Sequence, residues 1–377
     1  MIFYELLKSQ LIIESSNYFT DNYDFYSHPA KKKLKKRIIN FGKRILYTNT
    51  TFSLIFKSDF VFKNIFLKIY GLDKYLDRLD YFYNRLENEN SKKLLLKIVS
   101  FRILGYVKVK LPLSTTLYWS ELAELESLAN TELFLNINAN QNKLYCHDLS
   151  KLKIPVRLYM NTKGLYTTFC IEQYRLSLDK DQNIGATTND VVLDLGGCYG
   201  DTPLYFANQV GNGGKVFVFE FIPSNIAIMK KNFELNPSLS SQIEIFDKPV
   251  WQTSGKEVFY KEAGPMSKIS FQQFEGHDGK TNTISIDDFV NENNISKIDL
   301  IKTDIEGAEP FAIDGAVATL RKFRPKLAIS IYHSMDDFVN IIKQIDDLRL
   351  GYKFYLGHST IYSSETVLFC EVDVRRL

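Results

Sequence analysis

Cysteine is scarce in this sequence of 377 residues. The four cysteines, Cys146, Cys170, Cys198 and Cys370, are far apart and form neither a CxxC pair nor a zinc pattern. This spacing argues against a disulfide framework and predicts reduced thiols in a cytoplasmic protein. Cys198, which lies among glycines, is interpreted as a small residue that fills space.

Long apolar runs are also missing. No run approaches the roughly 18 apolar residues that a membrane-spanning helix needs, and Glu5 and Lys8 interrupt the apolar start, so we expect no secretory signal. The sequence therefore predicts a cytoplasmic protein, either soluble or peripheral to the inner face of a membrane.

The net charge is only +3, but its distribution is uneven. Residues 1–110 contain 21 Lys and Arg against 10 Asp and Glu, whereas the remainder is acidic. This asymmetry predicts a separate, mainly helical N-terminal domain. Residues 31–47 read as a basic amphipathic helix, with apolar residues at helical spacing among Lys and Arg. Two interpretations stay open: contact with an anionic membrane or a glycolipid, or a core-packed helix with a solvated basic face. We predict no nucleic-acid partner.

The pattern changes twice beyond residue 110. Residues 111–190 alternate apolar and polar positions, in segments such as ELFLNIN, VRLYMN and LYTTFCIEQYRL, which predicts a strand-rich lead-in with a turn at residues 161–164. Residues 191–377 alternate strand-like and helix-like segments and end in an antiparallel-looking pair. This alternation predicts an α/β fold with a doubly wound, mostly parallel sheet.

The stretch VVLDLGGCYG, residues 191–200, is the most informative one. A buried-type strand ends in Asp194 and is followed by Gly196, Gly197 and Gly200, which permit a tight turn and close approach of a ligand to the backbone. A dinucleotide loop has no carboxylate just before its glycines. The DxGxxxG spacing instead suits a cofactor that carries an ammonium and a carboxylate, such as S-adenosylmethionine, although a purely structural turn is the plain alternative.

Acids at the ends of the next two strands extend this prediction. Glu220 ends the strand KVFVFEF about twenty residues after the glycines, the offset at which an acid accepts hydrogen bonds from ribose hydroxyls. Asp247 stands at the end of the third strand, in the segment IEIFDKPVW, and is a candidate partner of the adenine amine. A solvated strand-end charge is the alternative for each.

Ionisable residues also follow the later strands, where open α/β sheets bind ligands. Asp304 and Glu306 follow KIDLIK, His333 follows KLAISIY, and His358 follows YKFYLG. If these strands are neighbours, the side chains converge as a general base for a hydroxyl or as ligands of a divalent metal such as Mg²⁺, held by Asp304 and His333. His333 is our preferred base. Capping of the following helices is the alternative for Asp304, Glu306 and His333.

Several motifs in order resemble one family, the FkbM-type S-adenosylmethionine-dependent methyltransferases. They cover about residues 150–375, and the DIEGAE hexapeptide beginning at Asp304 is the most specific of them. The motifs are QYR (173–175), VVLDLGGCYGDTPLYFA, FVFEFIPSN, TISIDDF, IDLIKTDIEGAEP, SIYHSMDD and GYKFYLGHST.

The resemblance implies a Rossmann-like class I methyltransferase domain that methylates oxygen, often a sugar hydroxyl. It places Asp194, Gly196, Gly197 and Glu220 at the cofactor, while Cys198 stands where the general DxGxGxG pattern has a glycine. The remaining predicted cofactor-binding residues are Tyr174, Cys198, Tyr199, Thr202, Phe221 and Asp247.

The sequence thus predicts a methyltransferase whose acceptor is a small molecule or a glycan precursor. Two alternatives stay open: an NAD(P)-dependent oxidoreductase on the same fold, and a non-catalytic scaffold. Asp194 and the missing GxGxxG spacing argue against the first. A scaffold would not need Glu220, Asp304 and His333. Neither the acceptor nor the oligomeric state follows from the sequence.

Overall fold

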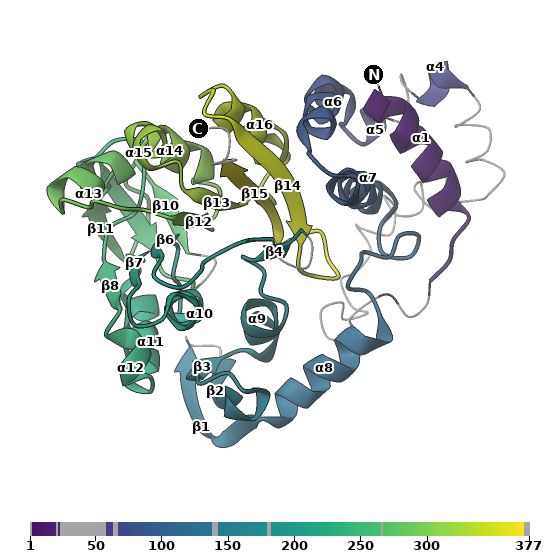
Figure 1. Cartoon of the computed structure of the whole chain (residues 1–377). Helices are drawn as coiled ribbons and strands as arrows, with labels where there is room; N and C mark the ends of the chain where they lie inside the picture. The colour runs from purple at the N-terminus through teal and green to yellow at the C-terminus, as the bar shows by residue number, and fades with distance from the viewer. Residues whose placement is uncertain are drawn as a thin grey trace. The chain divides into compact units, whose positions relative to one another are not determined.

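A seven-stranded sheet forms the centre of the α/β part of the chain (Figure 1). The computed structural model describes residues 2–19, 22, 58–62, 67–137, 142–178, 182–264 and 267–372. The strands are β6 (Val191–Leu195), β7 (Lys215–Phe219), β8 (Ile243–Phe246), β12 (Leu300–Thr303), β13 (Lys326–Ser330), β14 (Tyr352–His358) and β15 (Thr366–Val372). Their order across the sheet is β14-β15-β13-β12-β6-β7-β8.

The sheet is parallel from β13 to β8, and β15 runs antiparallel to both of its neighbours. The central strands are buried along almost their whole length, which is why the sequence shows continuous apolar runs there. The predicted doubly wound, mostly parallel sheet with an antiparallel last strand is confirmed.

Helices cover both faces of this sheet (Figure 1). One face carries α10 (Asp201–Val210), α11 (Pro223–Glu234) and α12 (Pro237–Ser240); the other carries α13 (Ile286–Glu292), α14 (Glu309–Asp314), α15 (Val317–Phe323) and α16 (Met335–Asp346). Phe289 of α13 packs edge-on against Phe219 and Phe246, with ring centroids 4.9 and 4.7 Å away. Such aromatic packing contributes beyond the area it buries and anchors α13 to the sheet.

Between β8 and α13 the chain forms a small antiparallel sheet. Its strands are β9 (Glu257–Lys261), β10 (Lys268–Ser270) and β11 (Gly279–Asn282), in the order β10-β9-β11. The side chain of Tyr260 on β9 packs against Phe221, which follows β7, with the ring centroids 5.8 Å apart. The small sheet therefore lies at the carboxyl end of β7.

The lead-in contains α8 (Thr116–Ser127), a three-stranded sheet of β1 (Ala129–Ile137), β2 (Asn142–Asp148) and β3 (Arg157–Met160), a 3-10 turn (Leu149–Leu152), and the short pair β4 (Leu176–Ser177) and β5 (Asn183–Ile184). The strand prediction is wrong for residues 165–170, which lie in α9 (Thr162–Leu165) and in a π-helical turn (Tyr166–Cys170). Asn161 starts this helix because its side chain accepts a hydrogen bond from the amide of Gly164.

The chain divides into two units, one of residues 1–115 with 360–365, and the other of residues 116–359 with 366–377. The described helices of the first unit are α1 (Ile2–Ser15), α4 (Asp59–Val61), α5 (Leu67–Ile69), a 3-10 turn (Asp73–Tyr75), α6 (Leu76–Arg85) and α7 (Glu89–Leu104). Leu7 and Leu11 of α1 and Leu95 and Val99 of α7 are fully buried. A mainly helical N-terminal unit is thus present. Residues 31–47 lie outside the described residues.

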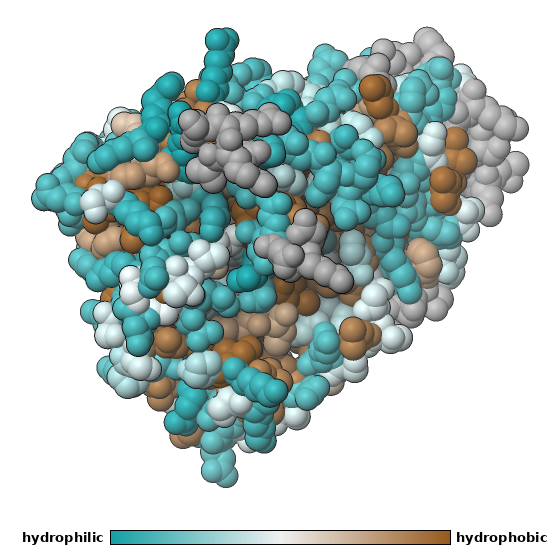
Figure 2. All heavy atoms as spheres, viewed as in Figure 1, coloured by the Kyte–Doolittle hydropathy of each residue, from teal (hydrophilic) through white to brown (hydrophobic). Residues whose placement is uncertain are grey.

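None of the described helices has the length and apolar composition needed to cross a bilayer. The face of the molecule seen in Figure 2 is mostly hydrophilic, with hydrophobic residues scattered among polar ones. Scattered exposed apolar residues are normal for a protein surface and need no special explanation.

Candidate active site

The glycine loop follows β6 and leaves no room for a side chain at Gly196 or Gly197. Gly196 has a φ of +91°, and a Cβ atom there would lie 2.0 Å from the carbonyl oxygen of Asp304. A Cβ atom on Gly197 would lie 2.1 Å from Val218 on β7. The amides of both glycines donate to the carbonyl of Phe219 (2.9 and 3.1 Å), which ties the loop to the end of β7. The glycines are therefore required by close contact as well as by the turn.

Cys198 also has a left-handed backbone, with a φ of 42°. This conformation favours glycine, so the cysteine stands at a strained position. Burial raises the pKa of its thiol well above the usual range, which argues against a nucleophilic thiolate. The interpretation of Cys198 as a small residue in the turn agrees with this environment.

Asp194 is completely buried and is held by two partners. Its carboxylate forms an ion pair with the buried ammonium of Lys302 (2.9 Å) and accepts a hydrogen bond from the hydroxyl of Thr202 (2.6 Å). Both oxygens are thus engaged within the protein. The predicted direct contacts of Asp194 and Thr202 with the cofactor stay predictions, whereas the structure assigns both side chains to holding the loop.

Lys302 was not among the predicted site residues. Its ammonium also donates to the carbonyl of Gly196 (2.7 Å), so one buried cation joins β12, β6 and the glycine loop. Burial by itself lowers the pKa of Lys302, and the carboxylates of Asp194 and Asp304 raise it above its ordinary value. A lysine at the end of a buried strand is rare unless it is paired, and this rarity was the available sequence signal.

Glu220 is buried at the carboxyl end of β7, beside the glycine loop. Its carboxylate accepts hydrogen bonds from the amide of Ile222 (2.8 Å) and from the side chain of Asn225 (3.2 Å). Burial raises its pKa, and these hydrogen bonds oppose the rise. The orientation of Glu220 is therefore fixed before any ligand binds, as a ribose-binding acid requires.

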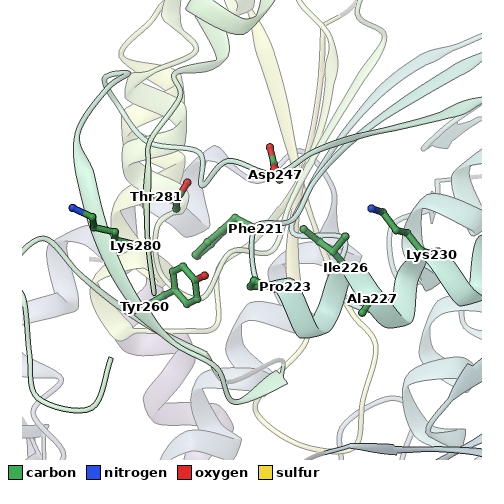
Figure 3. A pocket seen from close by; sticks show the side chains of 9 residues that line it. All are labelled: Phe221, Pro223, Ile226, Ala227, Lys230, Asp247, Tyr260, Lys280 and Thr281. Atoms are coloured by element: carbon green, nitrogen blue, oxygen red, sulfur yellow. The ribbon is translucent and has the colours of Figure 1, made fainter. Parts of the chain in front are cut away.

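A pocket of about 460 Å³ is lined by residues that follow β7 and β8 and by residues of the small sheet (Figure 3). Phe221 and Asp247, both predicted, lie in its wall, and Tyr260 from the small sheet packs edge-on against Phe221. The walls of the pocket combine aromatic and aliphatic side chains with two lysines, Asp247 and Thr281, so polar and apolar groups contribute about equally. The lining residues are Phe221, Pro223, Ile226, Ala227, Lys230, Asp247, Tyr260, Lys280 and Thr281.

Tyr199 is buried, and its backbone carbonyl accepts a hydrogen bond from Asn232 (2.8 Å). Tyr174, also predicted to bind the cofactor, lies buried with its hydroxyl donating to Asp304 (2.8 Å). Neither side chain lines the pocket described above. Their contacts with the cofactor stay predictions.

Acids and an imidazole gather beyond the carboxyl ends of the two neighbouring strands β12 and β13. Nε2 of His333 lies 3.4 Å from Asp304 and 3.7 Å from Glu306, and Nδ1 lies 3.3 Å from Glu309. The structure therefore brings the predicted Asp304, Glu306 and His333 together. Glu309 and Tyr332, whose hydroxyl donates to Asp304 (3.1 Å), were missed as site residues. Glu309 stands in the DIEGAE motif, which was the available signal.

Neither helix-capping alternative agrees with the structure. Helix α14 begins at Glu309, and the hydroxyl of Ser334 caps α16 by accepting from the amide of Asp337. Asp304 instead accepts from two tyrosines, and Glu306 has a left-handed backbone, with a φ of 56°. Strained residues of this kind cluster at functional sites.

His333 is nine-tenths buried among these carboxylates. Burial lowers the pKa of its imidazole, but Glu309, Asp304 and Glu306 raise it more strongly, to about 9. The imidazole therefore carries a positive charge at neutral pH in the ligand-free protein. The pKa of the half-exposed Glu306 is raised by burial and by its acidic neighbours, against the opposing effect of His333.

The structure does not bring His358 to this cluster. His358 ends β14, and β15 lies between β14 and β13 in the sheet. Its Nδ1 lies 2.9 Å from the hydroxyl of Thr366 on β15. The expected convergence of two imidazoles is wrong because the antiparallel strand separates their strands.

These features fit S-adenosylmethionine. The cradle formed by the glycine loop excludes every Cβ atom at Gly196 and Gly197, and the oriented acid Glu220 stands where ribose hydroxyls are bound in such folds. The surrounding carboxylates suit a ligand with a positively charged sulfonium and ammonium. The fold and the site are those of a Rossmann-like domain whose loop and acids fit S-adenosylmethionine.

Comparison with family models finds one domain in the chain. Residues 194–354 match the family model of the methyltransferase FkbM domain. No curated protein matches the chain.

Three solved structures are similar at low identity. Methyltransferase FkbM from Methylobacillus flagellatus KT is 16% identical over 80% of this chain and 60% of that chain, with a TM-score of 0.49. This chain thus matches less than two thirds of the Methylobacillus protein. Fibrillarin from Aeropyrum pernix, with natively bound S-adenosyl-L-methionine, is 13% identical over 63% and 93%, with a TM-score of 0.35. An O-methyltransferase from Bacillus cereus, in complex with SAH, is 15% identical over 59% and 86%, with a TM-score of 0.34.

Proposed function

We propose that this protein transfers a methyl group from S-adenosylmethionine to a hydroxyl oxygen of a sugar or of a glycan precursor. The observation that carries this proposal is the position of Asp304. Its backbone carbonyl lies against Gly196, its amide donates to the carbonyl of Leu195 (3.0 Å), and its carboxylate belongs to the acid and imidazole cluster. The cofactor loop and the ionisable cluster are therefore one continuous site.

The chemistry of the cluster favours an oxygen acceptor. When bound, the cofactor supplies an electrophilic methyl group on a sulfonium. A hydroxyl becomes a good nucleophile only when its proton is removed, whereas many nitrogen and sulfur acceptors react more readily. Asp304 and Glu306, whose carboxylates are partly exposed beside His333, provide groups that hold a hydroxyl and take its proton. Positioning of donor and acceptor then provides the remaining acceleration.

Two features support a sugar-like acceptor. Half-exposed Glu306 and partly exposed Asp304 offer carboxylate oxygens to several hydroxyls at once. Trp251 and Phe311 stack with ring centroids 3.8 Å apart, and Phe271 packs on the same tryptophan. Phe311 lies on α14, two residues after Glu309, and keeps 38% of its surface exposed. Exposed aromatic rings of this kind pack against the C–H face of a sugar ring.

The test is methyl transfer by the purified full-length chain. We would incubate it with S-adenosylmethionine carrying a tritiated methyl group and with nucleotide sugars, free sugars, simple phenols, amines and carboxylic acids. The proposal expects label in a sugar as an ether that resists alkaline hydrolysis. Label confined to amines, or lost in alkali as from an ester, would contradict it.

Calorimetry separates the two other functions. S-adenosylmethionine and NAD would be titrated separately into the same protein. Binding of NAD alone would favour the oxidoreductase, and binding of S-adenosylmethionine without transfer to any acceptor would favour the scaffold. Asp194, which stands just before the glycines and is paired with Lys302, argues against NAD binding, because a dinucleotide loop has no carboxylate at this position.

We also propose that the protein acts in the cytoplasm and that residues 31–47 contact an anionic membrane surface. The basic composition of this segment supports the contact. Co-sedimentation with vesicles that contain anionic lipid tests it, with neutral vesicles as the control. Equal recovery with both kinds of vesicle would contradict the proposed contact.

A further inference from the structure

Two buried side chains of the acid cluster have polar atoms without hydrogen bonds. Within the described part of the chain, Oε2 of Glu309 has no hydrogen-bond partner, although the side chain is completely buried. Neither ring nitrogen of His333 meets hydrogen-bond geometry, and the nearest atoms are carboxylate oxygens 3.3 to 3.7 Å away. Buried polar atoms are nearly always satisfied, so these atoms indicate a missing partner.

The charge of the cluster identifies what kind of partner is missing. Three carboxylates, Asp304, Glu306 and Glu309, surround one imidazole, so negative charge remains in excess even when His333 is protonated. The neighbouring cation Lys302 is engaged by Asp194 and by the carbonyl of Gly196. Buried charge of one sign is costly unless an opposite charge compensates it. A cation would supply that compensation.

The ligand atoms are close enough for a single ion. Asp304, Glu309 and His333 each offer one oxygen or nitrogen atom, and these atoms lie within 4.8 Å of one another. Atoms that share a metal ion about 2.1 Å away lie up to about 4.2 Å apart, so small side-chain shifts suffice. The atoms come from the loop after β12, the start of α14 and the loop after β13.

Surrounding hydrogen bonds already orient these side chains. Asp304 accepts from the hydroxyls of Tyr174 and Tyr332, and one oxygen of Glu309 accepts from the amide of Ile305 (2.8 Å), which leaves its other oxygen available. Ligands of natural metal sites are held in this way by partners outside the coordination sphere.

We propose that Asp304, Glu309 and His333 bind a hard divalent cation, Mg²⁺ or Mn²⁺. Two carboxylates and one imidazole match the preference of these ions for oxygen ligands, with Mn²⁺ accepting the nitrogen more readily. Glu306, half-exposed beside His333, lies at the open side of the site. The remaining coordination positions are left to water or to hydroxyls of the acceptor.

The site also deepens the proposed function, on which this consequence rests. A bound cation would lower the pKa of a hydroxyl that it held, and Glu306, the most exposed carboxylate of the cluster, would be placed to take the proton. His333 then serves as a ligand and not as the base.

Binding of Mn²⁺ to the full-length chain tests the cation site directly. Protein treated with a chelator and then dialysed would be titrated with Mn²⁺, and free Mn²⁺ would be followed by electron paramagnetic resonance. We expect one ion per chain, displaced by Mg²⁺. Glu309→Gln and His333→Gln should each weaken binding by about 10² or more. Glu292→Gln, the same change at an exposed position of α13, is the matched control and should leave binding unchanged.

Circular dichroism shows whether each variant is folded. If Glu309→Gln does not fold, Asp304→Asn replaces it, and thermal unfolding of the wild type with and without Mn²⁺ gives a second measurement, in which the ion should raise the Tm. No binding by the wild type at about 10 mM Mn²⁺, or equal binding by all variants, would overturn the site.

Failure of this inference would leave the methyltransferase proposal intact. Methyl transfer that is unaffected by chelator would then point to His333 as an imidazolium between carboxylates, with no cation. Failure to bind S-adenosylmethionine, in contrast, would overturn the proposed function and leave the Mn²⁺ titration interpretable.

Discussion

The two halves of the candidate site handle charge in opposite ways. On the cofactor side, each buried acid has its partners within the protein: Asp194 is paired with Lys302, and Glu220 accepts from Ile222 and Asn225. On the side of β12 and β13, carboxylates crowd around His333, and a buried oxygen of Glu309 has no hydrogen-bond partner among the described residues. The first half is organised before any ligand arrives, whereas the second half is completed by what it binds.

The largest expected loss of stability comes from replacing Lys302, the buried cationic side chain on the cofactor side. Lys302→Met leaves Asp194 buried without its counter-ion, and breaking a buried pair in this way costs about 3–5 kcal/mol of unfolding free energy. Urea denaturation measures it. Lys256→Met, at an exposed position, is the control. The double variant Lys302→Met/Asp194→Asn should regain part of the loss. A loss as small as that of the control would show that the pair does not hold the loop.

Disturbing the contact between the glycine loop and the backbone of Asp304, where the two halves of the site meet, should cause the next largest loss of stability. In Gly196→Ala the new methyl group collides with the carbonyl of Asp304, and the left-handed backbone adds strain, so we expect a loss of about 2–4 kcal/mol. Gly255→Ala is a matched control, because Gly255 has a φ of +78° with nothing within 4 Å of the added atom. The difference between the two variants in urea denaturation isolates the contact. Equal losses would mean that strain alone is responsible.

The pH dependence of stability examines the second half alone. The pKa of His333 rises from 6.5 to about 9 on folding, so its stabilising effect is fully present below pH 6.5 and is lost as the pH rises through about 9. In metal-free protein with chelator we expect the unfolding free energy to fall by about 2–3 kcal/mol over this window. His333→Gln should flatten the curve. Parallel curves for wild type and variant would refute the raised pKa.

The smallest effect is expected when Glu220, the proposed partner of the ribose hydroxyls, loses its charge. Glu220→Gln preserves shape but removes the charged acceptor, and we expect S-adenosylhomocysteine to bind about 10-fold more weakly, with little loss of stability. Isothermal titration calorimetry measures the Kd. Glu244→Gln on β8, in a half-exposed ion pair, is the control. An unchanged Kd would exclude Glu220 as the ribose partner.

Local patterns allowed the cofactor side to be predicted better than the cluster. The glycine loop and Glu220 lie within one βαβ unit, where spacing along the chain fixes spacing in the fold. Lys302 and Tyr332 act through neighbours more than 25 residues away, which no short pattern contains. His358 was misplaced because the sequence did not reveal that β15 inserts beside β13.

The helical turn at residues 165–170 was missed for a different reason. Its apolar residues also fit a strand pattern. The helical conformation is favoured by one side chain, that of Asn161, which caps the turn. Thr168 then hydrogen bonds to Asp201 at the start of α10 (2.7 Å), a contact across 33 residues that fixes the turn against the glycine loop.

The absence of space between Gly196 and the backbone of Asp304 has a thermodynamic consequence. A nucleoside that shifts the loop must also shift the carboxylate on the other side of the contact. Binding of the nucleoside at the loop and binding of a ligand at the acid cluster are then linked. By reciprocity, each ligand changes the affinity of the protein for the other by the same factor.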